Sequence, residues 1–151
     1  MTYRVKEAAY HHSKRIAEFQ IQMAMETEQI HLGRETVLKG VASVFEKPEL
    51  GRYFVAEINN EIVASLLITY EWSDWRNARI WWIQSVYVVP EHRRKGIFRL
   101  MYSHIRSIVE NNKDIGGIRL YVDKTNINAQ KTYDHIGMNG EHYQLYEWMK
   151  E

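Results

Sequence analysis

Apolar residues recur along this chain with two spacings, and each spacing predicts a different kind of element. Runs that alternate between apolar and polar positions, or that are rich in β-branched and aromatic residues, predict strands. The expected strands are Tyr3 to Glu7, Tyr53 to Ile58, Glu61 to Tyr70, Arg79 to Val89, Ile118 to Val122 and Tyr143 to Met149. Asn59-Asn60 separates the second strand from the third and is typical of a hairpin turn.

Apolar residues spaced three and four apart predict four helices. The expected helices are His11 to about Leu32, Glu35 to Glu46, Gly96 to about Asn112, and about Asn126 to Ile136. Gly33 and Gly137 follow the first and the last helix, where glycine commonly ends a helix. Strands and helices therefore alternate along a single domain of residues 1–151, and the fold class is α/β or α+β, with helices around a mixed sheet.

The strand Arg79 to Val89 has apolar residues at both odd and even positions, which predicts that both of its faces are buried. Pro90 ends it, and the basic turn Arg93-Arg94-Lys95-Gly96 leads into the next helix. A turn of this kind at a helix start forms an anion site, because free backbone N–H groups and the helix dipole point at the ligand. Gly96 lets a phosphate approach the main chain. On its own, such a turn is more often a solvated corner of the surface.

The composition narrows the classes of function. Hydrophobic residues make up 45% of the chain and the net charge is +1, which is typical of a globular domain whose basic sites are local. The absence of cysteine excludes disulfides, a thiol nucleophile and thiolate metal sites. His11 and His12 are adjacent and lack a metal-ligand spacing, so no metal is expected. Neither a signal peptide nor a membrane-spanning run is present, which predicts a cytoplasmic protein.

A second informative run is Asn126-Ile-Asn-Ala129-Gln-Lys-Thr-Tyr133-Asp-His-Ile-Gly137-Met138. Asn126 is expected to cap a short helix, and Ala129 allows a close approach to it. Tyr133 can bury its ring and keep its hydroxyl in a polar environment. On its own, a tyrosine on an apolar helix face is usually part of the core.

Taken together, the two runs resemble the GNAT superfamily of N-acetyltransferases. The basic turn matches that family's Gln/Arg-x-x-Gly-x-Gly/Ala loop at Arg93 and Gly96, with Phe98 in place of Gly or Ala. The second run matches the family's Asn-x-x-Ala-x-x-x-Tyr-x-x-x-Gly-Phe pattern, with Met138 in place of Phe. The resemblance implies a mixed, mostly antiparallel central sheet flanked by helices. The sheet would splay at the central strand, after Val86, and acetyl-CoA would lie in the gap as co-substrate.

The resemblance also implies roles for individual positions. Backbone groups at Val86, Tyr87 and Val88 would pair with the pantetheine arm of acetyl-CoA. The turn and the first helical residues would hold its pyrophosphate; this set is Arg93, Arg94, Lys95, Gly96, Ile97, Phe98 and Arg99. Asn126 and Ala129 would steady the cofactor arm. A substrate amine would attack the thioester directly, and Tyr133 would protonate the departing CoA thiolate.

The general base is not evident from the sequence. An alkylammonium group has a pKa of ~10.4, so the nucleophile must lose a proton before it attacks. Many relatives carry a carboxylate on the central strand, whereas this chain reads Ile83-Gln84-Ser85. Gln84 could orient a water but cannot titrate. Glu71, His104 and His142 are candidates, and deprotonation through water to bulk solvent is equally consistent with the sequence.

The acceptor is expected to be a small amine. The turn Trp72 to Asn77 carries two tryptophans, and acidic and aromatic side chains attract and hold a cation. The candidates for contacting the substrate are Glu26, Glu28, Glu71, Asp74, Trp72, Trp75 and Trp82, together with Gln84. A solvated helix end, core packing or a homodimer interface would explain the same acidic and aromatic residues.

Two other classes of function compete with an enzyme. The run His92-Arg-Arg-Lys95 with neighbouring aromatic residues could form a phosphate and stacking surface for nucleic acid, but the near-neutral net charge argues against it. A CoA-binding regulator without catalysis is favoured by Phe98 and Gln84, whereas Tyr133 favours an enzyme. We therefore expect an acetyl-CoA-dependent N-acetyltransferase with neither a nucleic-acid nor a membrane partner.

Overall fold

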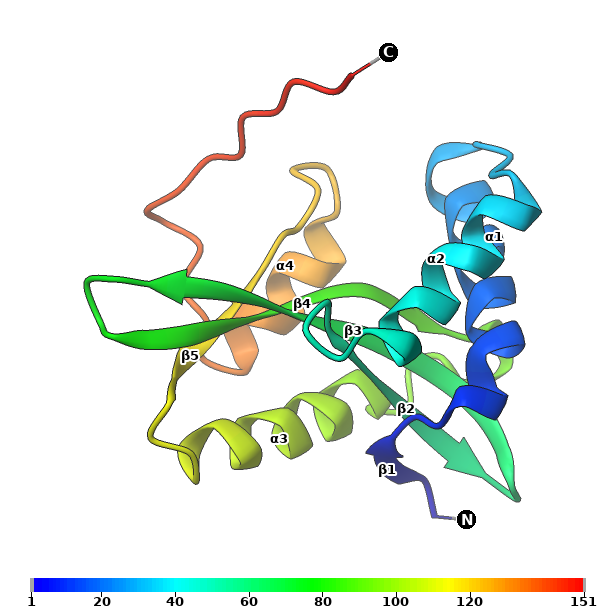
Figure 1. The fold of residues 1–151 in the computed structure, drawn as a ribbon, viewed down its shortest axis with the longest axis horizontal. Coiled ribbons are helices and arrows are strands. Elements are labelled where there is room, and N and C mark those ends of the chain that lie inside the picture. Colours follow the sequence, from blue (N-terminus) through cyan, green and yellow to red (C-terminus); the bar gives the residue numbers. More distant parts are fainter. Residues whose placement is uncertain (1, 151) are drawn as a thin grey trace. The chain divides into compact units, whose positions relative to one another are not determined.

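The computed structural model describes residues 2–150, which form two compact units, one up to Leu120 and one from Tyr121 onward. The first unit is built on a five-stranded sheet in the order β1-β2-β3-β4-β5 (Figure 1). Its strands are β1 (Arg4–Glu7), β2 (Arg52–Ile58), β3 (Glu61–Ser73), β4 (Ala78–Val88) and β5 (Ile115–Leu120). Neighbouring strands are antiparallel except for β4 and β5, which are parallel, so the sheet is mixed and mostly antiparallel.

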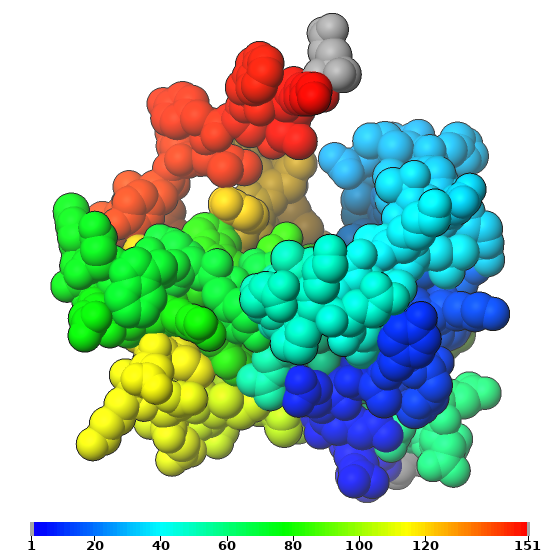
Figure 2. All heavy atoms as spheres, in the orientation of Figure 1, coloured from blue at the N-terminus to red at the C-terminus, as the bar shows by residue number. Residues whose placement is uncertain are grey.

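Helices cover both faces of this sheet (Figure 1). On one face, α1 (Ser13–Glu28) follows the 3-10 turn η1 (Tyr10–His12) and packs against β3 and β4, and α2 (Arg34–Glu46) packs against β2. On the other face, α3 (Ile97–Glu110) follows the 3-10 turn η2 (Pro90–His92) and packs against β1, β2 and β5. Figure 2 shows the β3–β4 hairpin, in green, beside α2, in cyan.

The core has two layers because successive side chains of a strand point to opposite faces. On one face, the ring of Phe54 lies 5.8 Å from that of His104 in α3. On the other, the ring of Tyr87 lies 5.2 Å from that of Phe19 in α1. Ile83 and Tyr87 of β4 are both buried. The prediction that both faces of the central strand are covered is therefore confirmed.

The predicted hairpin between β2 and β3 is also confirmed. Asn59 and Asn60 have φ values of 53° and 64°, the left-handed pair that a type I′ turn requires and that asparagine tolerates. The turn between β3 and β4 is shorter than expected, because β3 continues to Ser73 and Trp72 pairs with Arg79. Trp72 therefore belongs to a strand and not to the turn.

The prediction that Gly33 ends the first helix is wrong. The helix α1 ends at Glu28, and Gln29 caps it in the left-handed region with φ 53°. Gly33 instead precedes α2 as its N-cap. Ile30 and Leu32 continue the apolar spacing of the helix, but they are 47% and 37% exposed. The apolar pattern thus extends past the part of the helix that packs on the sheet.

The strand β5 begins earlier than predicted, at Ile115, and includes the glycines that were expected to precede it. Gly117 pairs with Ile80 of β4. A Cβ on Gly116 would lie 3.3 Å from the Cβ of Ala78 and 3.4 Å from Ile80 Cδ1. The absence of a side chain therefore lets this part of β5 lie close to β4.

The described residues of the second unit, 121–150, contain one helix, α4 (Ile127–His135). The Asn126 side chain caps it by accepting from the Ala129 N–H at 3.0 Å, and Gly137 follows it with φ 89°, as predicted. The predicted strand Tyr143 to Met149 is not formed. A strand needs a partner for its N–H and C=O groups, and the described residues from 121 to 150 contain no other strand. The large side chains of this segment are exposed.

Candidate active site

The central strand β4 carries a bulge. Ser65 of β3 pairs with Tyr87, and Leu67 pairs with Gln84, so β4 has one more residue than β3 between these two pairs. The irregularity includes Ser85, whose φ is 55°. This left-handed conformation costs a residue other than glycine ~1 kcal/mol or more. Bulges of this kind redirect backbone groups and frequently lie next to active sites.

The bulge lies where β4 loses its partner on one side. Pairing between β4 and β5 ends at Ile83 and Leu120. Among the described residues, no strand pairs with residues 84–88 along this edge. The expected opening of the sheet at the central strand is present, but it begins after Ile83, three residues before Val86, because β5 ends there. Backbone N–H and C=O groups of this open edge can bind an extended ligand that carries amides.

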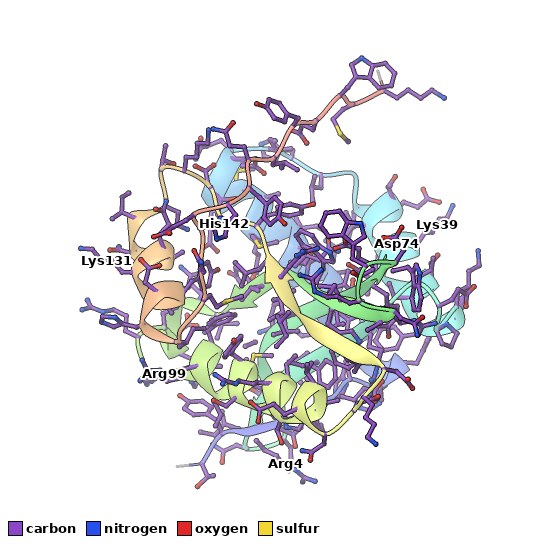
Figure 3. All side chains as sticks on the ribbon, turned by 90° about the vertical axis from the view of Figure 1, so that its left-hand side faces the viewer. Arg4, Lys39, Asp74, Arg99, Lys131 and His142 are labelled. Carbon is purple, nitrogen blue, oxygen red and sulfur yellow. The ribbon has the colours of Figure 1, made fainter. Side chains whose placement is uncertain are left out.

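The basic turn after β4 is shaped for an anion. Arg94 and Gly96 have φ values of 63° and 75°, and α3 begins directly after them without a side-chain cap. Successive N–H groups in such a turn form an anion-binding concavity, and the helix dipole adds positive charge. A Cβ on Gly96 would meet no atom within 4 Å, so the turn opens to the surface. Lys95 and Arg99 are exposed there, and Figure 3 shows Arg99 on the first turn of α3.

Phe98 stands where the resembling family has glycine or alanine. Its ring stacks on that of Tyr102 in the next turn of α3, with 6.4 Å between centroids and 30° between planes. The side chain is half-buried. The bulky residue at this position therefore packs along its own helix.

Arg93 joins the turn to α1. Its Nη2 donates to Glu26 Oε1 at 2.6 Å, and its Nε donates to the Val88 carbonyl at 2.8 Å. The Tyr87 hydroxyl donates to the other oxygen, Glu26 Oε2, at 2.5 Å. Hydrogen bonds from Tyr87 and Arg93 hold the pKa of Glu26 below its usual value. Burial, followed by the hydrogen bond to Glu26, raises the pKa of Tyr87 to about 12.

A second polar cluster lies on the sheet face that carries α1 and α2. Arg119 Nη1 donates to Glu71 Oε1 and Oε2 at 2.8 and 3.0 Å, and Trp82 Nε1 donates to Glu71 Oε1 at 2.8 Å. The hydrogen bonds from Arg119 and then from Trp82 lower the pKa of Glu71. Gln84 Nε2 donates to Thr69 Oγ1 at 2.5 Å on the same face. The cluster lies where the open edge of β4 begins, and Gln84 is the first residue of that edge.

Of the residues predicted to contact the substrate, the structure brings Glu71, Trp82 and Gln84 to this cluster. Trp72 follows Glu71 in β3, so its side chain points to the opposite face, where it is 61% exposed. Glu26 is engaged by Arg93, and Glu28 is an exposed residue at the end of α1. Sequence reasoning missed Arg119, although a lone arginine in a short apolar strand was a signal that could have found it.

The residues predicted to steady the cofactor arm and to protonate the CoA thiolate, Asn126, Ala129 and Tyr133, belong to the second unit. The Asn126 side chain is used to cap α4, through the N–H of Ala129. Tyr133 is half-buried, and burial raises the pKa of its hydroxyl. The phenol is therefore protonated near neutral pH and able to donate a proton.

Three further features concern His104, metal binding and membrane spans. His104 is half-buried and packs edge-on against Phe54, on the sheet face that carries α3. Residues 2–150 hold no group of three His, Cys, Asp or Glu side chains that could bind a metal ion. No helix in this range is long and apolar enough to cross a membrane.

The sequence matches the model of the acetyltransferase (GNAT) family over residues 8–138. No curated protein gives a match. Among solved structures, a possible acetyltransferase from Clostridium difficile 630 is similar to this chain with 40% identity and a TM-score of 0.92, covering 100% of this chain and 99% of its own.

Two more distant structures share the fold. A predicted acetyltransferase with acetyl-CoA from Clostridium acetobutylicum has 18% identity and a TM-score of 0.75, with 96% of each chain covered. An aminoglycoside acetyltransferase from an uncultured soil metagenomic sample, in complex with sisomicin, has 14% identity and a TM-score of 0.76. It covers 99% of this chain and 96% of its own.

Proposed function

Because this chain belongs to the GNAT family of acetyltransferases, we propose that it transfers an acetyl group from acetyl-CoA to a primary amine of a small molecule. One observation carries this proposal: the open edge of β4 leads directly into the Arg94–Gly96 turn and the uncapped start of α3. The edge offers backbone groups to the pantetheine amides, and the turn offers N–H groups and positive charge to the pyrophosphate. The residues therefore fit both halves of acetyl-CoA.

Backbone groups would make most of the cofactor contacts. Val86 and the N–H of Val88 would pair with the pantetheine arm, and the N–H groups from Arg94 to Arg99 would hold the pyrophosphate. The side chains of Lys95 and Arg99 would add charge at the surface. Asn126 and Ala129 would shape α4, which carries Tyr133.

The chemistry is direct attack of the amine nitrogen on the thioester carbonyl. A C–N bond forms and the C–S bond breaks, while the attacking nitrogen loses a proton and the CoA sulfur gains one. Tyr133 would supply the proton to sulfur, since its phenol is protonated at neutral pH and a thiol has a pKa of ~8.5. Glu71 is a poor general base, because its pKa is lowered by Arg119. We infer that the amine loses its proton through water, with Gln84 orienting that water.

The acceptor amine would bind beside Gln84, Trp82 and Glu71. Glu71 already balances the charge of Arg119, so the cluster does not present an unpaired carboxylate to a polycation. The indole of Trp82 offers an aromatic surface to an alkyl or ring substituent. These features favour a small amine over a lysine-rich peptide.

A thiol-release assay tests the proposal. The chain has no cysteine, so a thiol reagent reports only CoA set free by transfer, and the protein gives no background. We expect release that depends on both acetyl-CoA and an amine from a panel of small primary amines. Lack of release across the panel, with acetyl-CoA bound, would instead support a CoA-binding regulator, which the absence of a free carboxylate on β4 favours as the second candidate.

A further inference from the structure

Three side chains from distant parts of the chain converge beside the basic turn. Glu26 lies near the end of α1, Tyr87 lies in β4, and Arg93 lies directly after η2. The Glu26 carboxylate accepts from the Tyr87 hydroxyl at 2.5 Å and from Arg93 Nη2 at 2.6 Å. The Arg93 guanidinium also lies 5.4 Å from the centre of the Tyr87 ring. We call these three residues the latch.

The latch also reaches the open edge of β4. The Val89 N–H donates to Val63 of β3, so by alternation the backbone groups of Val88 point to the opposite edge, where β5 has ended. Arg93 Nε donates to this Val88 carbonyl at 2.8 Å. Arg93 therefore connects the edge expected to bind pantetheine with the helix α1.

An exposed ion pair by itself contributes little, and the side chains of Arg93 and Glu26 are 42% and 37% exposed. This pair differs because Glu26 is also fixed by Tyr87, which is only 4% exposed. The next residue in the chain, Arg94, has a φ of 63°. Such a strained conformation persists only when its surroundings hold it. The latch fixes the residue immediately before this strained position.

We propose that the Glu26–Tyr87–Arg93 latch holds the Arg94–Gly96 turn in its anion-binding shape. This inference rests on the proposed function. Arg93 is then a positioning residue, and its side chain does not bind the pyrophosphate. Glu26 is likewise a positioning residue and does not contact the amine. The cations at the turn that are left for the anion are Arg94, Lys95 and Arg99.

The charge-removing variant Glu26→Gln separates this proposal from simple electrostatics by the sign of its effect. If Glu26 only contributes its charge, its removal near an anion site strengthens acetyl-CoA binding. If the latch shapes the turn, the same variant weakens acetyl-CoA binding by about tenfold, a difference of about 1.4 kcal/mol. We expect the weaker binding, with a raised KM for acetyl-CoA and a kcat that is largely kept.

A double-mutant cycle tests whether Arg93 acts through Glu26. We expect Arg93→Met to weaken binding at least as much as Glu26→Gln. The double variant should bind no more weakly than Arg93→Met alone, because the latch is broken once. Independent effects that multiply would show that Arg93 contacts the phosphate itself and would overturn the proposal.

Glu91→Gln is the matched control. Glu91 is an exposed carboxylate two residues before Arg93, and no ion pair or side-chain hydrogen bond of it is found among the described residues. We expect unchanged or slightly tighter binding of acetyl-CoA by this variant. Melting temperatures confirm that each variant is folded. If the wild type does not bind acetyl-CoA, the proposed function is wrong. If the wild type binds acetyl-CoA and Glu26→Gln binds it equally well or more tightly, only the latch proposal is wrong.

Discussion

Replacing Gly96 tests the anion site with a single side chain. Gly96 has a φ of 75°, and a Cβ added there meets no atom within 4 Å. The folded state therefore loses only the cost of holding an L-residue in the left-handed region, roughly 1 kcal/mol. Asparagine and aspartate both tolerate this region better than other side chains do. Gly96→Asn thus carries the same backbone cost as Gly96→Asp without the charge.

The difference between the two variants measures charge at the turn. The pyrophosphate carries about two negative charges, and Coulomb's law in water gives about 1.4 kcal/mol of repulsion for one carboxylate at roughly 6 Å. At low ionic strength, where screening is weak, this corresponds to about tenfold in affinity. The lower effective dielectric constant near the protein surface increases the effect. We therefore expect Gly96→Asp to bind acetyl-CoA at least tenfold more weakly than Gly96→Asn.

Calorimetric titration of wild type, Gly96→Asn and Gly96→Asp with acetyl-CoA at low salt measures this difference. Thermal unfolding of the same preparations checks that both variants lose similar and small amounts of stability. If the two variants bind acetyl-CoA within about threefold of each other, the pyrophosphate does not lie at this turn and the reasoning fails.

The remaining predictions concern the chemistry. Tyr133→Phe removes the proton donor and keeps the ring, so turnover should fall by roughly 10²-fold or more, while the affinity for acetyl-CoA is nearly unchanged. If turnover is unchanged although the chemical step is rate-limiting, Tyr133 is only a packing residue. Glu71→Gln should leave the pH dependence of kcat/KM in the alkaline range unchanged, since a carboxylate with a lowered pKa is already ionised there. If the rise of kcat/KM with pH were lost in this variant, Glu71 would be the base. Because the folded-state pKa of Glu71 lies below its ordinary value of 4.5, its contribution to stability is present above that value and disappears as the pH falls. The free energy of unfolding should therefore decrease less steeply with falling pH in Glu71→Gln than in the wild type.

Local patterns predicted the parts of the fold that local physics decides. The Asn59-Asn60 turn and the apolar strand β4 needed only turn chemistry and side-chain alternation, and both are confirmed. The end of α1 was missed because the apolar spacing continues through Ile30 and Leu32 after the contact with the sheet has ended. Tyr143 to Met149 has the composition of a strand, but a strand also needs a partner, which no local pattern reveals.

In the candidate site too, features built from neighbouring residues were predictable from the sequence, and contacts between distant residues were not. The turn from Arg93 to Gly96 was identifiable because strand, turn and helix start are contiguous in the sequence. The pairing of Arg93 with Glu26 spans 67 residues, so the sequence suggested a phosphate ligand and a substrate contact where the structure has an ion pair. Alternation alone would have separated Glu71 from Trp72, which face opposite sides of β3.

Amide hydrogen exchange with and without acetyl-CoA shows whether the cofactor lies on the open edge of β4 and at the start of α3, because exchange reports on the backbone N–H groups themselves. We expect acetyl-CoA to slow exchange in peptides that cover residues 84–88 and 94–99, the open edge of β4 and the start of α3. The β2–β3 hairpin around Asn59 should exchange at an unchanged rate and serves as the internal control. If neither segment is protected under conditions in which acetyl-CoA is bound, the cofactor binds elsewhere on the protein.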